Sequence, residues 1–121
     1  MKPSILVIDD DPAIVDLVRD ILEFEGYQVA VATNGCEGIT ILDQVHPVLV
    51  LLDMRMPVLD GWGFARVLKE RGTRVPIVVM TAAQDAKQWA QEIRADGYVA
   101  KPFEFDELLH AVNAIKFPGM A

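Results

Sequence analysis

Residues 48–57 read Val-Leu-Val-Leu-Leu-Asp-Met-Arg-Met-Pro, so five apolar residues lead directly into one carboxylate, Asp53. A continuous Val/Leu run of this length is typical of a strand that is buried on both faces, as in a parallel sheet. Asp53 would then stand at the carboxyl end of this strand, which is the edge where open α/β sheets bind their ligands. The alternative is that Asp53 only caps the helix that follows. Other segments of the chain supply partners for this carboxylate, and they favour a functional site.

The size and composition of the chain indicate one domain, which we expect to span residues 1–121. Hydrophobic residues make up 52% of the sequence, and the net charge is −7 with no run of basic residues, so nucleic-acid binding through this domain is not expected. The one cysteine, Cys36, can form no internal disulfide, and we find no secretory signal. No apolar stretch approaches the roughly 20 residues that span a bilayer. We therefore expect a cytoplasmic protein without membrane contact, in which residues 117–121 form a tail after the last helix.

Segments with strand and helix patterns alternate along the chain. Buried strands are expected over residues 5–8, 27–32, 48–52, 76–80 and 97–100. Each is followed by apolar residues at helical spacing, as with Ile14, Val18 and Leu22 after Pro12. Strands that alternate with amphipathic helices predict a parallel α/β sheet covered on both faces, with right-handed crossovers. Periodicity alone leaves the order of the strands open.

The polar residues of most interest each follow directly on a predicted strand: Asp9, Asp10, Asp53, Thr81 and Lys101. Because parallel strands end at one edge of the sheet, these side chains can converge there. Three carboxylates at close range either raise some of their pKa values or hold a cation. A hard divalent ion fits best, with Mg²⁺ as the natural candidate and Mn²⁺ as a substitute. A carboxylate beside such an ion can form an acyl-phosphate, with the Lys101 ammonium and the Thr81 hydroxyl as partners of the phosphoryl oxygens.

These motifs together resemble the receiver domain of bacterial two-component response regulators, over essentially the whole chain. The matching residues are Asp9-Asp10, Asp53 with Pro57 and Asp60-Gly61, Met80-Thr81-Ala82, and Tyr98 with Lys101-Pro102-Phe103. Each motif alone is weak, but all of them in this order, each after a strand, are highly specific. The resemblance implies a flavodoxin-like (βα)5 fold, in which a doubly wound, five-stranded parallel sheet has the strand order 2-1-3-4-5.

The resemblance also implies a signal-transduction role for particular residues. Asp53 would accept a phosphoryl group from a histidine kinase or a histidine phosphotransfer protein, as one step of a phosphorelay. Asp10, Asp53 and the backbone carbonyl of Arg55 would bind Mg²⁺ directly, and Asp9 would act through water. The protein would catalyse its own phosphotransfer and dephosphorylation as a signalling switch, rather than act as a conventional enzyme.

In the same family pattern, Lys101 would pair with the bound phosphoryl group, and its peptide bond to Pro102 would be cis. Thr81 would turn toward a phosphoryl oxygen, and Tyr98 would swing inward behind it. These movements would change the surface formed by the fourth helix, the fifth strand and the fifth helix. That surface would meet an output partner or a second copy of the chain.

Two other functions use similar residues. A metal-dependent phosphatase of the haloacid dehalogenase type also forms an aspartyl-phosphate, but that family needs Asp-x-Asp-x-Thr/Val after its first strand. Here Ala13 breaks the pattern, and no cap insertion is present. The other alternative is a receiver-like module that interacts with partners without being phosphorylated. The complete set of site residues argues against it.

Two arginines depart from the commoner pattern of the family. Arg94 occupies a position where many relatives have glycine, so the loop into the fifth strand can differ. Arg55 places a large cation two residues after Asp53. We expect its charge to reach the metal and phosphoryl region and to tune the site without being essential.

Trp89 is a candidate anchor for a partner. It lies one position off the stripe of Ala86, Ala90 and Ile93, which follows the i, i+4, i+7 spacing of a core-facing helix. We therefore expect its ring to be at least partly exposed, and exposed tryptophans are frequent binding hot spots. The alternative is that Trp89 folds over the edge of the core.

Overall fold

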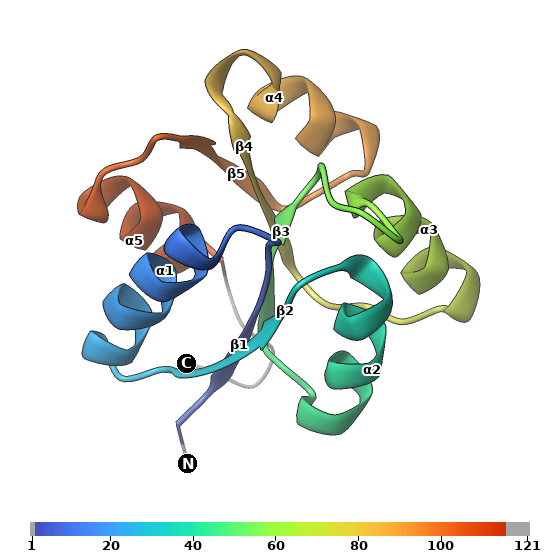
Figure 1. Cartoon of the computed structure of the whole chain (residues 1–121), viewed down its shortest axis with the longest axis horizontal. Helices are drawn as coiled ribbons and strands as arrows, with labels where there is room; N and C mark the ends of the chain where they lie inside the picture. Colours follow the sequence, from blue (N-terminus) through green and yellow to red (C-terminus); the bar gives the residue numbers. More distant parts are fainter. Residues whose placement is uncertain (1, 116–121) are drawn as a thin grey trace.

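The computed structural model describes residues 2–115, and the tail expected at residues 117–121 lies outside them. Figure 1 shows a central sheet with helices on both sides. The strands are β1 (Ser4–Ile8), β2 (Gln28–Ala32), β3 (Leu49–Asp53), β4 (Ile77–Ala82) and β5 (Gly97–Lys101). The helices are α1 (Pro12–Phe24), α2 (Gly35–Val45), α3 (Gly61–Arg71), α4 (Ala83–Glu92) and α5 (Phe105–Asn113). Among the described residues, no helix has the length and apolar character needed to cross a membrane.

All strand pairs are parallel, and the order across the sheet is β2-β1-β3-β4-β5. The prediction of a flavodoxin-like fold with this strand order is therefore confirmed. β3 lies between β1 and β4, and its register pairs Leu52 with Ile8 on one side and Asp53 with Met80 on the other. The carboxyl ends of these three strands consequently lie at the same edge of the sheet.

The central strand β3 is buried along its whole length, which explains its continuous apolar run. Leu49 and Leu51 face a core that includes α1 and α5, whereas Val50 and Leu52 face a second core with α2, α3 and α4. Full burial of such a side chain contributes about 1.5–3 kcal/mol. In Figure 1, α1 and α5 lie on the left of the sheet, opposite α2 and α3. The two layers together fix β3, and with it the position of Asp53.

Side-chain caps mark the first turns of α1 and α3, the two helices that follow β1 and β3. Asp11 Oδ1 accepts a hydrogen bond from the Ala13 N–H at 3.0 Å, and Asp60 Oδ1 accepts one from the Gly63 N–H at 2.8 Å. Caps of this kind are worth about 1 kcal/mol each. Because these caps follow β1 and β3 in the chain, α1 and α3 begin close to the acidic edge of the sheet.

The expectation that Trp89 is partly exposed is wrong. Only 9% of Trp89 is exposed, and the residue belongs to the core that α2, α3 and α4 share. The reason is helix geometry: Trp89 comes three residues after Ala86, and positions i, i+3 and i+4 form one face of a helix. Ala86, Trp89 and Ala90 are the buried residues of α4. Trp89 therefore cannot serve as an exposed anchor in this conformation.

Candidate functional site

Three carboxylates meet where β1 and β3 end. Asp9 and Asp10 follow β1, and Asp53 is the last residue of β3. One carboxylate oxygen of each residue lies within 4.8 Å of the other two. Asp9 and Asp53 are buried whereas Asp10 is exposed, so the cluster opens to solvent on the Asp10 side. The fold thus brings together the three acids that were expected at one sheet edge.

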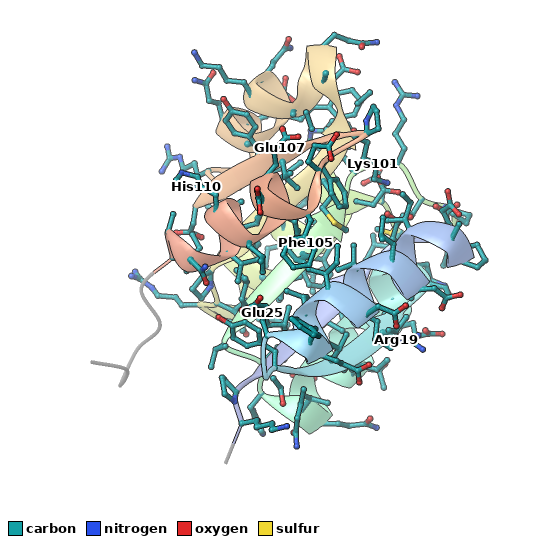
Figure 2. The ribbon with its side chains drawn as sticks, turned by 90° about the vertical axis from the view of Figure 1, so that its left-hand side faces the viewer. Arg19, Glu25, Lys101, Phe105, Glu107 and His110 are labelled. Atoms are coloured by element: carbon teal, nitrogen blue, oxygen red, sulfur yellow. The ribbon has the colours of Figure 1, made fainter. Side chains whose placement is uncertain are left out.

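Lys101, which is labelled in Figure 2, stands at the end of β5 and supplies a positive charge to this cluster. Its Nζ lies 2.7 Å from Asp9 Oδ2 and 3.6 Å from Asp53 Oδ1. The other oxygen of Asp9 accepts a hydrogen bond from the Asp11 N–H at 2.9 Å. Both oxygens of this almost fully buried carboxylate therefore have partners. The peptide bond between Lys101 and Pro102 is cis.

Burial and neighbouring charges shape the ionisation of Asp53. Burial, reinforced by the Asp9 carboxylate, raises the pKa of Asp53 to about 6. The Lys101 ammonium and a hydrogen bond from the Arg55 backbone N–H act in the opposite direction. Asp53 is therefore mainly ionised at neutral pH, but it is more basic than an exposed aspartate.

The donor set of the cluster fits Mg²⁺. Among the described residues, Lys101 forms ion pairs with two of the three clustered carboxylates, Asp9 and Asp53, so negative charge is in excess when Asp9, Asp10 and Asp53 are all ionised. Mg²⁺ prefers hard oxygen ligands and keeps several waters, which needs a site that is open on one side. The exposed Asp10 provides that open side.

Thr81 and Tyr98 lie on the strands beyond β3. Asp53 pairs with Met80 of β4, so Thr81 stands one residue past the strand neighbour of Asp53. Thr81 is buried, whereas Tyr98 on β5 is 46% exposed. In this conformation the Tyr98 side chain therefore contacts solvent.

A cation and two tryptophans form a contact chain beside the acidic cluster that the sequence analysis did not anticipate. The Arg55 Cζ lies 5.1 Å from the ring centroid of Trp89. Trp89 meets Trp62 edge to face, with 4.8 Å between ring centroids, and Trp62 Nε1 donates to Glu92 at 2.9 Å. The i, i+3 relation between Ala86 and Trp89 could have revealed the buried ring. The contact with Arg55 has no local sequence signature, because it joins a loop to a distant helix.

Comparison with known proteins relates the whole described fold to one family. Residues 5–113 match the family described as the response regulator receiver domain. The chain is 39% identical over 117 residues to the DNA-binding dual master transcriptional regulator RpaA of Synechocystis, with 93% of this chain and 48% of the relative covered. It is also 39% identical over 116 residues to the DNA-binding response regulator MtrA of Mycolicibacterium smegmatis, and this match covers 94% of this chain and 50% of the relative. The chain thus spans about half the length of the curated relatives it matches.

Solved structures agree with this match. A putative response regulator from Chloroflexus aurantiacus has a TM-score of 0.87 at 31% identity, covering 94% of this chain and 97% of that one. The chemotaxis protein CheY4 of Vibrio cholerae has a TM-score of 0.85 at 25% identity, and this match covers 96% of this chain and 100% of the CheY4 chain. The family match runs from β1 into α5, and the strand order and acidic edge agree with it. The chain therefore belongs to the receiver domain family of two-component response regulators.

Proposed function

We propose that this receiver accepts a phosphoryl group on Asp53 from a histidine kinase or a histidine phosphotransfer protein. The observation that carries the proposal is the geometry around Asp53. Two further aspartates have oxygens within 4.8 Å, and the Lys101 Nζ lies 3.6 Å away. Family membership supplies the class of reaction. We place this exchange in the cytoplasm, in a domain that extends over residues 1–121 and catalyses its own phosphotransfer and dephosphorylation.

In the transfer, a carboxylate oxygen of Asp53 attacks the phosphorus of a phosphohistidine. A P–O bond forms, the P–N bond breaks, and the leaving imidazole nitrogen takes up a proton. The signal ends when water attacks the phosphorus and the bond between the phosphorus and the Asp53 oxygen breaks. Inorganic phosphate is released, and the Asp53 carboxylate is restored. A pKa of about 6 suits the nucleophile, because Asp53 is ionised at neutral pH and yet more basic than an exposed aspartate.

In this proposal, Asp10, Asp53 and the backbone carbonyl of Arg55 hold Mg²⁺ directly, with Mn²⁺ as a possible replacement. When bound, the ion neutralises charge on the carboxylates and on the phosphoryl oxygens. Asp9 acts through water. This role suits Asp9 because its side chain is already engaged at 2.7 Å by Lys101.

Phosphorylation first changes the partners of Lys101. Its Nζ lies between Asp9 and Asp53 in the unphosphorylated chain, and a phosphoryl group on Asp53 adds a stronger anionic acceptor at the same place. The Thr81 hydroxyl then turns toward a phosphoryl oxygen. Tyr98, which is exposed here, moves inward behind it.

The surface that responds is formed by α4, β5 and α5. A groove of about 700 Å³ lies between β5 and α5, and Tyr98, His110 and Ile115 contribute to its lining. Figure 2 shows this side of the molecule, with His110 and Glu107 on α5. We propose that an output partner or a second copy of the chain binds here when Asp53 is phosphorylated. With a net charge of −7, the domain itself is not expected to contact nucleic acid.

Mass spectrometry of the intact chain after incubation with acetyl phosphate or phosphoramidate tests the proposal. We expect a covalent phosphoryl adduct in the wild-type chain that requires Mg²⁺ and disappears when EDTA is present. Asp53→Asn should abolish the adduct, whereas Asp11→Asn, at the cap of α1, should retain it. An undiminished adduct in Asp53→Asn would refute the assignment of the phosphoacceptor.

A further inference from the structure

The contact chain of Arg55, Trp89, Trp62 and Glu92 runs from the acidic cluster to α3 and α4. The proposed transfer uses the Arg55 backbone carbonyl but none of the side chains in this contact chain. At one end, the Arg55 backbone N–H is hydrogen-bonded to Asp53. The guanidinium of the same residue lies over the Trp89 ring, with 5.1 Å between Cζ and the ring centroid. Arg55 therefore contacts the phosphoacceptor through its backbone and α4 through its side chain.

The Trp89 ring is a fixed platform for this cation. It is 9% exposed and is held edge to face against Trp62 at 4.8 Å. Trp62 is itself tied to α4 by a 2.9 Å hydrogen bond to Glu92, whose other oxygen accepts from Gln88 at 3.1 Å. Arg55 is exposed, and its side chain lies over the Trp89 ring. Within the described part of the chain, it forms no ion pair with a carboxylate. The position of the cation therefore depends on Trp89.

We propose that Trp89 is a positioning residue for the metal site: it holds the Arg55 guanidinium off the carboxylates and fixes the backbone of residue 55. The inference rests on the proposed function, in which the Arg55 carbonyl is a Mg²⁺ ligand. A released guanidinium would be attracted to the excess negative charge of Asp10 and Asp53 and would compete with the ion. A mobile residue 55 would also have to be ordered when the ion binds. The competing guanidinium and the cost of ordering residue 55 both lower the affinity for Mg²⁺. Loss of the Trp89 ring therefore weakens Mg²⁺ binding.

The same contact makes the metal site sensitive to the position of α4, because Trp89 is part of that helix. Coupling between two binding events is reciprocal. A partner that displaces α4 would change the affinity for Mg²⁺, and Mg²⁺ would change the surroundings of Trp89. This route from Asp53 to α4 runs through Arg55 and is separate from the route through Thr81 and Tyr98.

A double-mutant cycle on Mg²⁺ affinity tests the inference in the unphosphorylated chain, with amide chemical shifts near Asp53 as the readout. Trp89→Leu removes the aromatic face, and Arg55→Met removes the charge while it keeps the length of the side chain. We expect Trp89→Leu to weaken Mg²⁺ binding by about threefold when Arg55 is present, as for the loss of one cation–π contact. The same substitution should have no effect in the Arg55→Met background. Trp89→Phe, which keeps an aromatic face, should retain most of the affinity.

Equal weakening by Trp89→Leu in both backgrounds, or no weakening in either, would overturn the inference. Should Trp89→Leu fail to fold, Trp62→Phe leaves Trp89 as the only tryptophan, and its emission should then change when Mg²⁺ is added. Arg55→Met should remove that change, and its persistence would contradict the proposed coupling. Absence of any Mg²⁺ response near Asp53 in the wild-type chain would refute the metal site itself. Failure of the cycle alone leaves the assignment of Asp53 intact.

Discussion

At the scale of single residues, Asp53 should give the folded chain a recognisable pH dependence. Its pKa rises from an ordinary 3.8 to about 6, so between these values the folded chain keeps a proton that the unfolded chain has lost. The free energy of unfolding therefore falls as the pH rises from about 4 to about 6. We predict that Asp53→Asn flattens this fall and is more stable than wild type at pH 7. Urea titrations at both ends of this range measure the effect, and parallel pH profiles of the two proteins would contradict it.

Arg94, two residues after the end of α4 at Glu92, has a backbone conformation that is unfavourable for any residue with a Cβ. Its φ of 55° is left-handed, which costs an L-residue energy through its Cβ and costs glycine nothing. The family resemblance predicts glycine at this position in many relatives, and the left-handed φ of residue 94 is a physical reason for such a preference. We predict that Arg94→Gly raises the free energy of unfolding by about 0.5–1 kcal/mol. Arg94→Ala keeps the Cβ and should leave the free energy of unfolding unchanged. Thermal unfolding measures both variants, and an equal gain in stability in the two would show that the backbone conformation is not the cause.

At the scale of elements, the connection between β3 and α3 fixes the position of the strand that ends at Asp53. A Cβ on Gly61 would come within 2.8 Å of the Met54 Cα, and the Gly61 N–H donates to the Met54 carbonyl at 3.0 Å. We predict that Gly61→Ala lowers the free energy of unfolding by about 1–3 kcal/mol, because the backbone at Met54 must move to make room for the new Cβ. Gly63→Ala, two residues later, meets mainly the end of the flexible Leu59 side chain and should cost little. Similar losses in the two variants, compared by urea unfolding, would rule out this explanation.

The elements differ in how well their burial can be predicted from the sequence. β3 was predictable because it is buried on both faces, so every residue of the strand is constrained to be apolar. Trp89 was assigned to the wrong face because an i, i+4, i+7 stripe leaves out the i+3 position, which faces the core as well. The contact of Trp89 with Arg55 was beyond prediction, since it depends on how a loop and a helix meet in three dimensions.

At the scale of the whole molecule, the convergence of Asp9, Asp10, Asp53 and Lys101 was predictable because parallel strands end at one edge. The strand order came from the family resemblance, since periodicity does not encode which strands pair, and the structure confirms it. The 2.7 Å contact between Lys101 and Asp9 was not foreseen. Sequence spacing places residues at an edge of a sheet, but the directions of long side chains follow from local packing and charge.

The central claim is that Asp53 is the residue that carries the phosphoryl group, and chemical trapping of the acyl-phosphate tests it most directly. Borohydride reduces an aspartyl-phosphate to homoserine, which peptide mass spectrometry can assign to one position. After incubation with phosphoramidate and Mg²⁺, we predict this conversion at residue 53 and its absence when EDTA is present. Conversion at Asp9 or Asp10, or a phosphorylated chain with no reducible aspartate, would contradict the account.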